Sequence, residues 1–187
     1  MITEATPLKD GILLRPVVEA DAEAMLAAYE RNREHLLPWE PRRAPEFFTL
    51  AGQRARIREM VETQRLGQLV PLILVDGDRM IGTMTLSGIV MGPFRNANLG
   101  YWVDGEYNGR GIASLAVQAV LHAADEQLGL HRIQAGTLVH NVASQRVLAK
   151  AGFELIGRAP RYLAINGVWQ DHLLFQRILH DRPPTVS

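Results

Sequence analysis

The stretch LGYWVDGEYNGRGIASL, residues 99–115, combines a strand-like run, two closely spaced glycines and the beginning of a helix. Its first part, Leu99–Asp104, is rich in the apolar and aromatic residues that strands favour. Gly109 and Gly111 allow a sharp backbone turn that brings N–H groups close to a ligand. A helix that begins near Ile112 adds about half a positive charge at its first turn. The stretch therefore predicts a strand, an anion-binding loop and a helix.

Two familiar nucleotide-binding motifs do not fit this loop. A Rossmann site needs three spaced glycines near the first strand and an acidic residue about 20 positions later. A Walker loop needs Gly-Lys followed by Ser or Thr. The sequence has neither arrangement at residues 108–113. A glycine turn of this kind can also be a simple connection, so the loop alone leaves both interpretations open.

Hydrophobic periodicity extends the prediction to the rest of the chain. Strands are expected at Gly11–Pro16, Val70–Val75, Arg79–Leu86, Leu99–Asp104, His131–Val139, Phe153–Ile165 and Val168–Ile178. Helices are expected at Val18–Arg33, Glu46–Leu66, Ile112–Leu128 and Val142–Ala151. Asn166-Gly167 is the residue pair best suited to a type I′ hairpin turn. In the second helix, the expected inner stripe is Ile57, Val61 and Leu66; in the third it is Val117, Val120, Leu121, Ala124 and Leu128.

The order of these elements predicts a mixed α/β sheet in one unit. The chain has 187 residues and a mass of 20.8 kDa, which suits one substantial hydrophobic core better than two. We therefore expect a single domain over residues 1–187, with its core at about 11–178 and a frayed tail at 179–187.

The composition excludes several classes of function. Lys plus Arg and Asp plus Glu number 20 each, so there is no basic field for stable non-specific nucleic-acid binding. The chain has no cysteine, which rules out a cysteine acyl-enzyme. His122, His131, His172 and His180 lack metal-ligand spacing, so we expect no metal. No apolar run approaches the length of a membrane span, and a cytoplasmic location without membrane contact is the expectation.

Four stretches resemble one enzyme family. Residues 100–113 are similar to the acetyl-CoA signature of GNAT acetyltransferases, with Asn108 where the family usually has Gln or Arg. His140-Asn141-Val142-Ala143-Ser144, with the Gly-Phe pair at 152–153, resembles the Asn-x-x-Ser pattern of the RimJ/RimL branch. Arg33–Trp39 and Asn166–His172 extend the resemblance, which covers roughly Gly11 to Arg177.

The resemblance implies a fold and a cosubstrate. The implied fold is the GNAT α/β fold, a mixed, mostly antiparallel seven-stranded sheet flanked by about four helices. The implied cosubstrate is acetyl-CoA, with its pyrophosphate on the glycine loop and its pantetheine arm along the splayed strand end. The expected cofactor-binding residues are Tyr101, Trp102, Val103, Asn108, Gly109, Arg110, Gly111, Ile112, Ala113, Ser114 and Asn141.

Acetyl transfer needs a neutral amine, donors for the oxyanion and a proton for the departing thiolate. Family precedent makes Ser144 the proton donor, although it could simply cap its helix. Asn141 can be a helix N-cap, a pantetheine contact or both. A backbone N–H in Trp102–Val103 is the expected oxyanion donor. Since residues 81–98 contain no acidic residue, water-relayed deprotonation is preferred, with His140, His35 and Glu34 as alternatives.

The acceptor is expected to be a primary amine, most simply a protein or peptide N-terminus. The rivals are a small amine, such as an aminoglycoside or polyamine, and a non-catalytic acyl-CoA-binding module. Trp39, Phe94 and Tyr101 could wall the acceptor pocket, although each could equally be core. Core packing is expected for Trp102 and Trp169. A homodimer is also compatible with the sequence.

Overall fold

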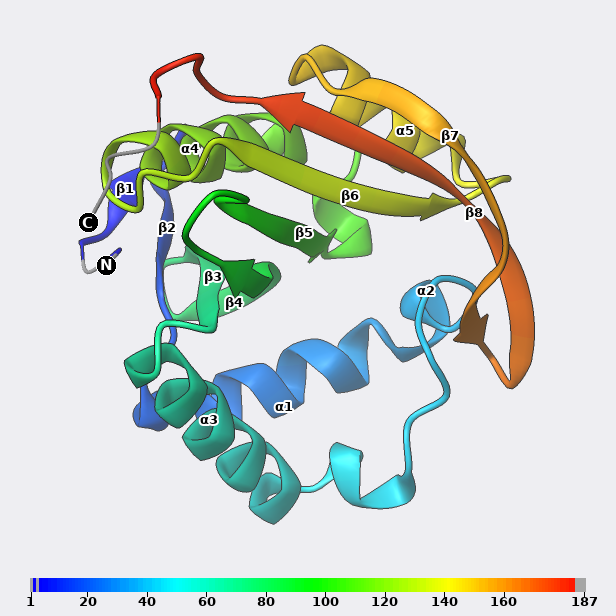
Figure 1. Ribbon diagram of the computed structural model, residues 1–187. Coiled ribbons are helices and arrows are strands. Elements are labelled where there is room, and N and C mark those ends of the chain that lie inside the picture. The colour runs from blue at the N-terminus through cyan, green and yellow to red at the C-terminus, as the bar shows by residue number, and fades with distance from the viewer. Residues whose placement is uncertain (1, 3, 184–187) are drawn as a thin grey trace.

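The computed structural model describes residues 2 and 4–183 and contains one eight-stranded sheet (Figure 1). The strands are β1 (Thr6–Pro7), β2 (Ile12–Pro16), β3 (Leu69–Asp76), β4 (Arg79–Val90), β5 (Asn96–Val103), β6 (Arg132–Leu138), β7 (Glu154–Ile165) and β8 (Val168–Ile178). Their order across the sheet is β1-β2-β3-β4-β5-β6-β8-β7. Only the β5–β6 pair is parallel among these described strands. The expected α/β fold with a mixed, mostly antiparallel sheet is confirmed.

Five α-helices and three short 3₁₀ helices connect the strands of the described chain. The α-helices are α1 (Ala22–Arg31), α2 (Arg33–Leu36), α3 (Leu50–Arg65), α4 (Ile112–Glu126) and α5 (Val142–Lys150). The 3₁₀ helices are Glu19–Asp21, Pro45–Phe48 and Gly105–Tyr107. Within the described residues, none of these helices is long and apolar enough to span a membrane. The last four residues of the expected frayed tail, 184–187, lie outside the described residues.

The seven expected strands are all present, and an eighth was missed. That eighth strand, β1, has only two residues, too few for an alternating pattern. The expected type I′ turn is confirmed, because Asn166 and Gly167 have φ values of 48° and 82°.

The helix expected at Val18–Arg33 is interrupted by local side-chain hydrogen bonds. The Asp21 carboxylate accepts the Val18 N–H at 2.8 Å and holds the chain in a 3₁₀ turn before α1. At the other end, the Asn32 amide donates to the Ala28 carbonyl at 2.9 Å and accepts the Gly105 N–H at 2.9 Å. These bonds separate α1 from the four-residue α2.

The helix expected at Glu46–Leu66 begins later than predicted. Thr49 is its N-cap, with the Gly52 N–H donating to the Thr49 hydroxyl at 3.0 Å. Leu66 lies beyond the helix end and is 65% exposed, so its assignment to the inner stripe was wrong. Ile57 is buried as expected, and Met60 is buried in addition.

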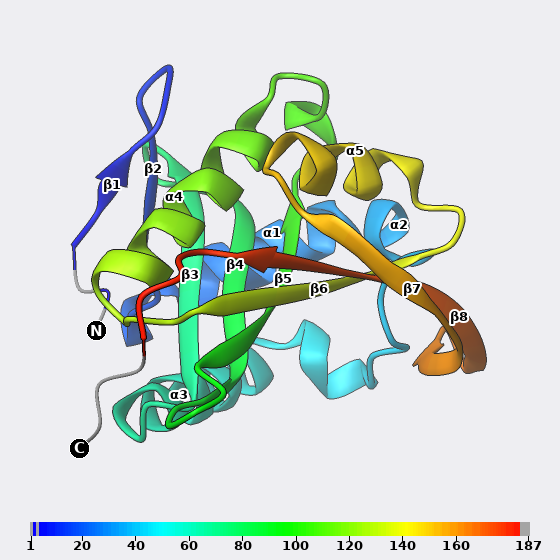
Figure 2. The same ribbon diagram turned by 45° about the horizontal axis from the view of Figure 1, so that its top comes forward.

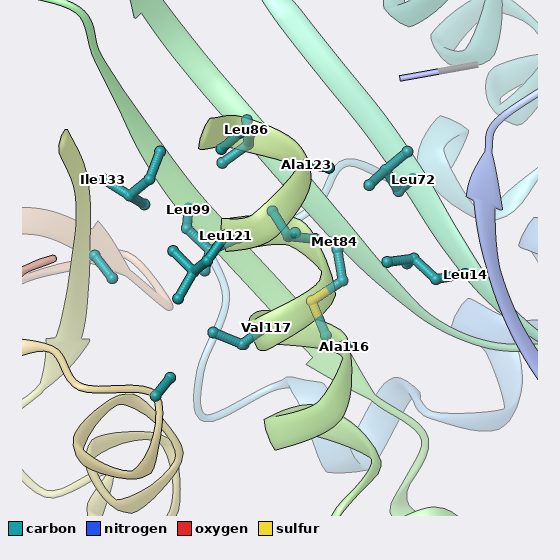
Figure 3. Close-up of a cluster of buried hydrophobic side chains, with 14 of the residues drawn as sticks. Leu14, Leu72, Met84, Leu86, Leu99, Ala116, Val117, Leu121, Ala123 and Ile133 are labelled. Carbon is teal, nitrogen blue, oxygen red and sulfur yellow. The ribbon is translucent and has the colours of Figure 1, made fainter. Parts of the chain in front are cut away.

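The two faces of the sheet are covered by different helices. In Figure 1, α4 and α5 lie on one face and α1 and α3 on the other. Figure 3 shows α4 packed over Met84, Leu86 and Leu99 through Val117 and Leu121. Trp102 is buried on the α1/α3 face, as expected for a core residue. Trp169 is 64% exposed on β8, so its expected core role was wrong.

Strands β5 and β6 pair only at one end. Their register runs from Asn96–Arg132 to Asn98–Gln134 and stops there. Beyond that point β5 continues beside β4, while β6 continues beside β8. Figure 2 shows the two strands diverging. Backbone groups on the facing edges of both strands are therefore left without a strand partner.

A buried carboxylate anchors the end of β5. Asp104 is 1% exposed and accepts hydrogen bonds from Arg31 Nε at 2.7 Å, Arg79 at 3.3 Å and the Glu106 N–H at 3.0 Å. Burial raises the pKa of Asp104, but hydrogen bonds involving Asn32, the Glu106 N–H and Arg31 outweigh it and set the pKa at about 2. The ionised carboxylate thus ties α1 to the segment that leads into the glycine turn.

We expect Asp104→Asn to lower the free energy of unfolding at neutral pH by about 2–3 kcal/mol, because the guanidinium of Arg31 loses its charged partner. The folded pKa lies below the unfolded one, so this stability is present above about pH 4 and is lost as pH falls toward about 2. Urea unfolding across this range checks both effects. Glu62→Gln, which breaks an exposed pair with Arg65, is the control and should cost less than about 0.5 kcal/mol. Equal losses in the two variants would contradict the anchoring role.

Candidate active site

The glycine turn at residues 108–111 is exposed and open. Gly109 and Gly111 have φ values of 75° and 78°, which L side chains rarely adopt, and a Cβ at either position would meet no atom within 4 Å. The first backbone bond of α4 runs from the Leu115 N–H to the Gly111 carbonyl at 3.1 Å, and no side chain caps the helix. The N–H groups of residues 111–114 therefore have no acceptor within the helix. With the helix dipole behind them, they suit an anion such as a pyrophosphate.

Two side chains of the turn contact neighbouring residues. The Arg110 guanidinium lies over the Tyr107 ring, 4.7 Å from its centroid. The Asn108 amide lies 3.4 Å from His35 Nε2 on α2. This contact places His35 beside the turn, where it steadies the Asn108 side chain. Ile112 is buried, so only its backbone faces the turn.

The direction of each peptide group in β5 follows from the ladder with β4. The Asp104 N–H donates to the Ile81 carbonyl at 2.7 Å. Hydrogen-bonded pairs alternate along an antiparallel ladder, so the Trp102 peptide also faces β4. The N–H and C=O groups of Tyr101 and Val103 face the opposite way, toward the opening between β5 and β6.

Trp102 was expected to contact the cofactor, but its polar groups do not face the opening between β5 and β6. Its peptide faces β4, and its indole N–H donates to the Tyr29 hydroxyl at 3.2 Å on the other face of the sheet. The ladder with β4 directs the Trp102 peptide away from the opening. The alternation of side chains along the strand directs its indole to the other face of the sheet.

The Tyr101 hydroxyl joins β5 to α5. The Tyr101 hydroxyl lies 2.8 Å from the Ser144 hydroxyl in the first turn of α5. The Asn141 side chain accepts the Ser144 N–H at 3.1 Å, so Asn141 is the N-cap of this helix. Burial raises the pKa of Tyr101 to about 12, and the hydrogen bond with Ser144 opposes this only in part. The phenol stays protonated at neutral pH and can donate to Ser144.

Of the three expected acceptor-pocket residues, Tyr101 belongs to this pair, Trp39 is linked to it through His140, and Phe94 lies elsewhere. None of the three lines the cavity described below. Trp39 packs against His140, with ring centroids 5.5 Å apart, and His140 directly precedes Asn141. Phe94 lies in the β4–β5 turn, 48% exposed, beyond the opposite end of β5 from Tyr101. Five strand residues at about 3.3 Å each already separate Asn96 from Tyr101. Phe94 therefore does not share a pocket with Tyr101, and that expectation was wrong.

A cavity of about 860 Å³ lies on the α1/α3 face of the sheet. It is bounded by α1, α2, residues 37–45, the 3₁₀ helix Pro45–Phe48 and the β7–β8 turn at Asn166. The tip of the β7–β8 hairpin reaches toward α2 to close one side (Figure 1). Tyr29, which lines the cavity, also accepts the Trp102 indole bond. The cavity is therefore linked through Tyr29 to Trp102, the direct chain neighbour of Tyr101.

Sequence reasoning missed the basic lining of this cavity. Arg33, Arg42 and Arg43 all contribute to it. The available signal was the run Pro-Arg-Arg-Ala-Pro at 41–45, an arginine pair held between prolines that restrict the backbone. Among the described residues, no group of three or more His, Asp and Glu side chains could hold a metal ion.

Comparison with known proteins shows the family. The acetyltransferase (GNAT) domain model matches residues 12–154. A probable N-acetyltransferase of Bacillus subtilis, YjcK, is 39% identical over 86% of this chain and 90% of its own length. The [ribosomal protein uS5]-alanine N-acetyltransferase of Escherichia coli K12 is 34% identical over 88% of this chain and 86% of its own length.

Solved structures agree with this assignment. A ribosomal-protein-S5-alanine acetyltransferase from Vibrio fischeri superimposes with a TM-score of 0.92 at 36% identity, covering 97% of this chain and 100% of that one. Mycobacterium smegmatis RimJ in complex with CoA-disulfide gives a TM-score of 0.88 at 30% identity, with coverages of 93% and 86%. The chain therefore belongs to the GNAT acetyltransferase family, in its RimJ/RimL branch, and is an acetyl-CoA-dependent N-acetyltransferase.

Proposed function

We propose that this enzyme acetylates the N-terminal amino group of a protein or peptide, by direct transfer from acetyl-CoA. The observation that carries the proposal is the cavity on the α1/α3 face, whose lining residue Tyr29 accepts a hydrogen bond from Trp102, the chain neighbour of Tyr101. The cavity volume of about 860 Å³ is large for a ligand pocket, and one side is formed by the β7–β8 turn. Such a cavity has room for the residues that follow an N-terminal amine. Two relatives named for ribosomal-protein alanine acetylation support this acceptor class.

The lining of the cavity argues against a polycationic small amine. An aminoglycoside or polyamine needs several carboxylates within reach. The cavity has one carboxylate, Glu40, among the described residues that line it, and this group pairs with Arg43 at 3.2 Å. Arg33 and Arg42 add further positive charge. A peptide acceptor fits this charge pattern better.

The coenzyme is proposed to lie along the opening between β5 and β6. The unpaired N–H groups of Gly109, Arg110, Gly111, Ile112, Ala113 and Ser114 would hold its pyrophosphate. The edge peptides of Tyr101 and Val103, with Asn141 nearby, would bind its pantetheine arm. The uncapped helix start and the unpaired strand edge fit such a ligand, because both leave polar backbone groups to be satisfied. When bound, the thioester supplies the activated acetyl group.

Ser144 is proposed to protonate the departing thiolate. When Tyr101 donates to Ser144 Oγ, the proton of Ser144 is free to be donated in turn. The Val103 N–H faces the opening and is the proposed oxyanion donor. Of the two backbone N–H groups expected for this role, those of Trp102 and Val103, only that of Val103 is retained.

An N-terminal acceptor needs little help from a base. An α-amino group has a pKa near 8, so roughly a tenth is neutral at pH 7, whereas a lysine side chain is neutral less than about one time in a thousand. A water relay is therefore sufficient to deprotonate an N-terminal amine. His140 and His35 are engaged by Trp39 and Asn108 respectively, which favours structural roles for both.

The acceptor class is tested by release of free thiol from acetyl-CoA. We expect release with peptides that have a free N-terminus, and little with N-terminally blocked lysine peptides, polyamines or aminoglycosides. Faster release with a polyamine than with any peptide would contradict the proposal. Release without any amine would contradict acetyl transfer to an acceptor.

We expect Ser144→Ala to lower kcat by about a hundredfold or more, because the thiolate loses its proton donor. The KM for acetyl-CoA should change by less than about twofold. The Asn141 cap bonds the backbone N–H of residue 144 and is retained in the variant, so the helix start should stay folded. Steady-state kinetics measure both values. An unchanged kcat would leave Ser144 with only a structural role.

We expect Gly111→Ala to raise the KM for acetyl-CoA by about tenfold, because a Cβ at a φ of 78° strains the turn by about 1–2 kcal/mol. Gly67→Ala is the matched control. Gly67 has a φ of 72°, and a Cβ there also meets no atom within 4 Å, but it lies in the α3–β3 connection. The two variants should lose similar stability, and only Gly111→Ala should lose coenzyme affinity. Equal KM values for both would argue against the proposed pyrophosphate site.

A further inference from the structure

The cavity bounded by α1, α2 and the β7–β8 turn carries two guanidinium groups without a carboxylate partner. Arg43 pairs with Glu40. Neither Arg33 nor Arg42 forms an ion pair with a described residue. By contrast, Arg31, the last residue of α1 and two residues before Arg33, is bound to Asp104. The free positive charge of this region is therefore concentrated at the cavity.

Aromatic rings hold part of this charge in place. The Arg33 guanidinium lies 4.2 Å from the centroid of the Phe48 ring, and Arg43 lies 4.8 Å from that of Phe47. Stacking of this kind uses the face of the guanidinium and leaves its N–H edges free to donate. An arginine already restrained loses less entropy when it binds a ligand. Arg33 is thus prepared for a planar anion.

The anion that matches such an edge is a carboxylate. The fork of guanidinium N–H groups fits the two oxygens of a carboxylate in a bidentate pair. A peptide offers this group on Asp or Glu side chains. The rings of Tyr29, Phe47 and Phe48 would contact the apolar part of the same peptide.

The cavity lining is linked to the start of α5 through Trp39. Leu37 and Glu40 line the cavity on either side of Trp39, which contacts His140 next to the Asn141 cap. An extended peptide advances about 3.3 Å per residue. We place the amine of a bound peptide near Ser144 and its next few residues in the cavity.

We infer that Arg33 and Arg42 select acceptors with Asp or Glu among the first few residues after the acetylated N-terminus. This inference rests on the proposed N-terminal acceptor and adds to it the chemical class of the acceptor sequence. Added salt should weaken the preference, because Arg42 is exposed and its attraction is screened.

The test compares short alanine-initiated peptides that differ only in residues two to four, which are acidic, amide or lysine. The expected kcat/KM, from thiol release, is about tenfold higher for the acidic peptide than for its amide counterpart. Arg42→Glu should abolish this preference, and the Arg33→Glu, Arg42→Glu double variant should favour the lysine peptide. Arg42 lies in an exposed loop, so Arg42→Glu should fold normally. This single variant still tests the inference if the double variant does not fold.

Arg58→Glu is the control for a general change in charge. Arg58 lies on α3, 69% exposed at its side chain, and pairs weakly with Glu19 at 3.7 Å. It should leave the peptide preference unchanged. Equal kcat/KM for acidic and amide peptides, unaffected by Arg42→Glu, would overturn this inference and leave the N-terminal acceptor standing. No release with any peptide would overturn the proposed acceptor class and this inference with it.

Discussion

The site depends on one feature of the sheet, the point at which β5 leaves β6. Their pairing ends at Asn98–Gln134, and from there the peptides of Tyr101 and Val103 face an edge with no strand beside it. Unpaired backbone groups are costly unless a ligand or water satisfies them. The divergence is held on both sides, by the Asp104 carboxylate at the end of β5 and by the Tyr101–Ser144 hydrogen bond to α5. The proposed contacts of Tyr101 and Val103 with the pantetheine arm follow from this arrangement.

At the same point, acetyl-CoA and the acceptor are proposed to approach β5 from opposite faces of the sheet. The Tyr101 side chain meets Ser144 on α5, whereas the Trp102 side chain meets Tyr29, which lines the cavity on the other face. Alternation along one strand thus places the proposed proton donor on one face and the acceptor pocket on the other. Arg33 and Arg42 belong to the second face, so a change in acceptor preference need not disturb the glycine turn.

Sequence predicted what is encoded locally. Gly109 and Gly111 fix the turn by their own backbone freedom, the Asn166-Gly167 pair fixes the hairpin, and hydrophobic periodicity located every strand but β1. Contacts between distant segments set the rest. The break between α1 and α2 depends on Asn32 meeting Gly105, 73 residues away. The direction of Trp102, the partner of Ser144 and the displacement of Phe94 from the acceptor side depend on strand register, which a single sequence does not specify.

Residue-resolved amide hydrogen exchange, with and without CoA, tests whether the coenzyme lies where β5 and β6 part. We expect CoA to protect the amides of Tyr101, Val103 and residues 111–114, while the Trp102 amide, already bonded to β4, keeps its exchange rate. Protection of Trp102 in place of Val103, or no change at these positions with CoA bound, would contradict a coenzyme seated where β5 and β6 part.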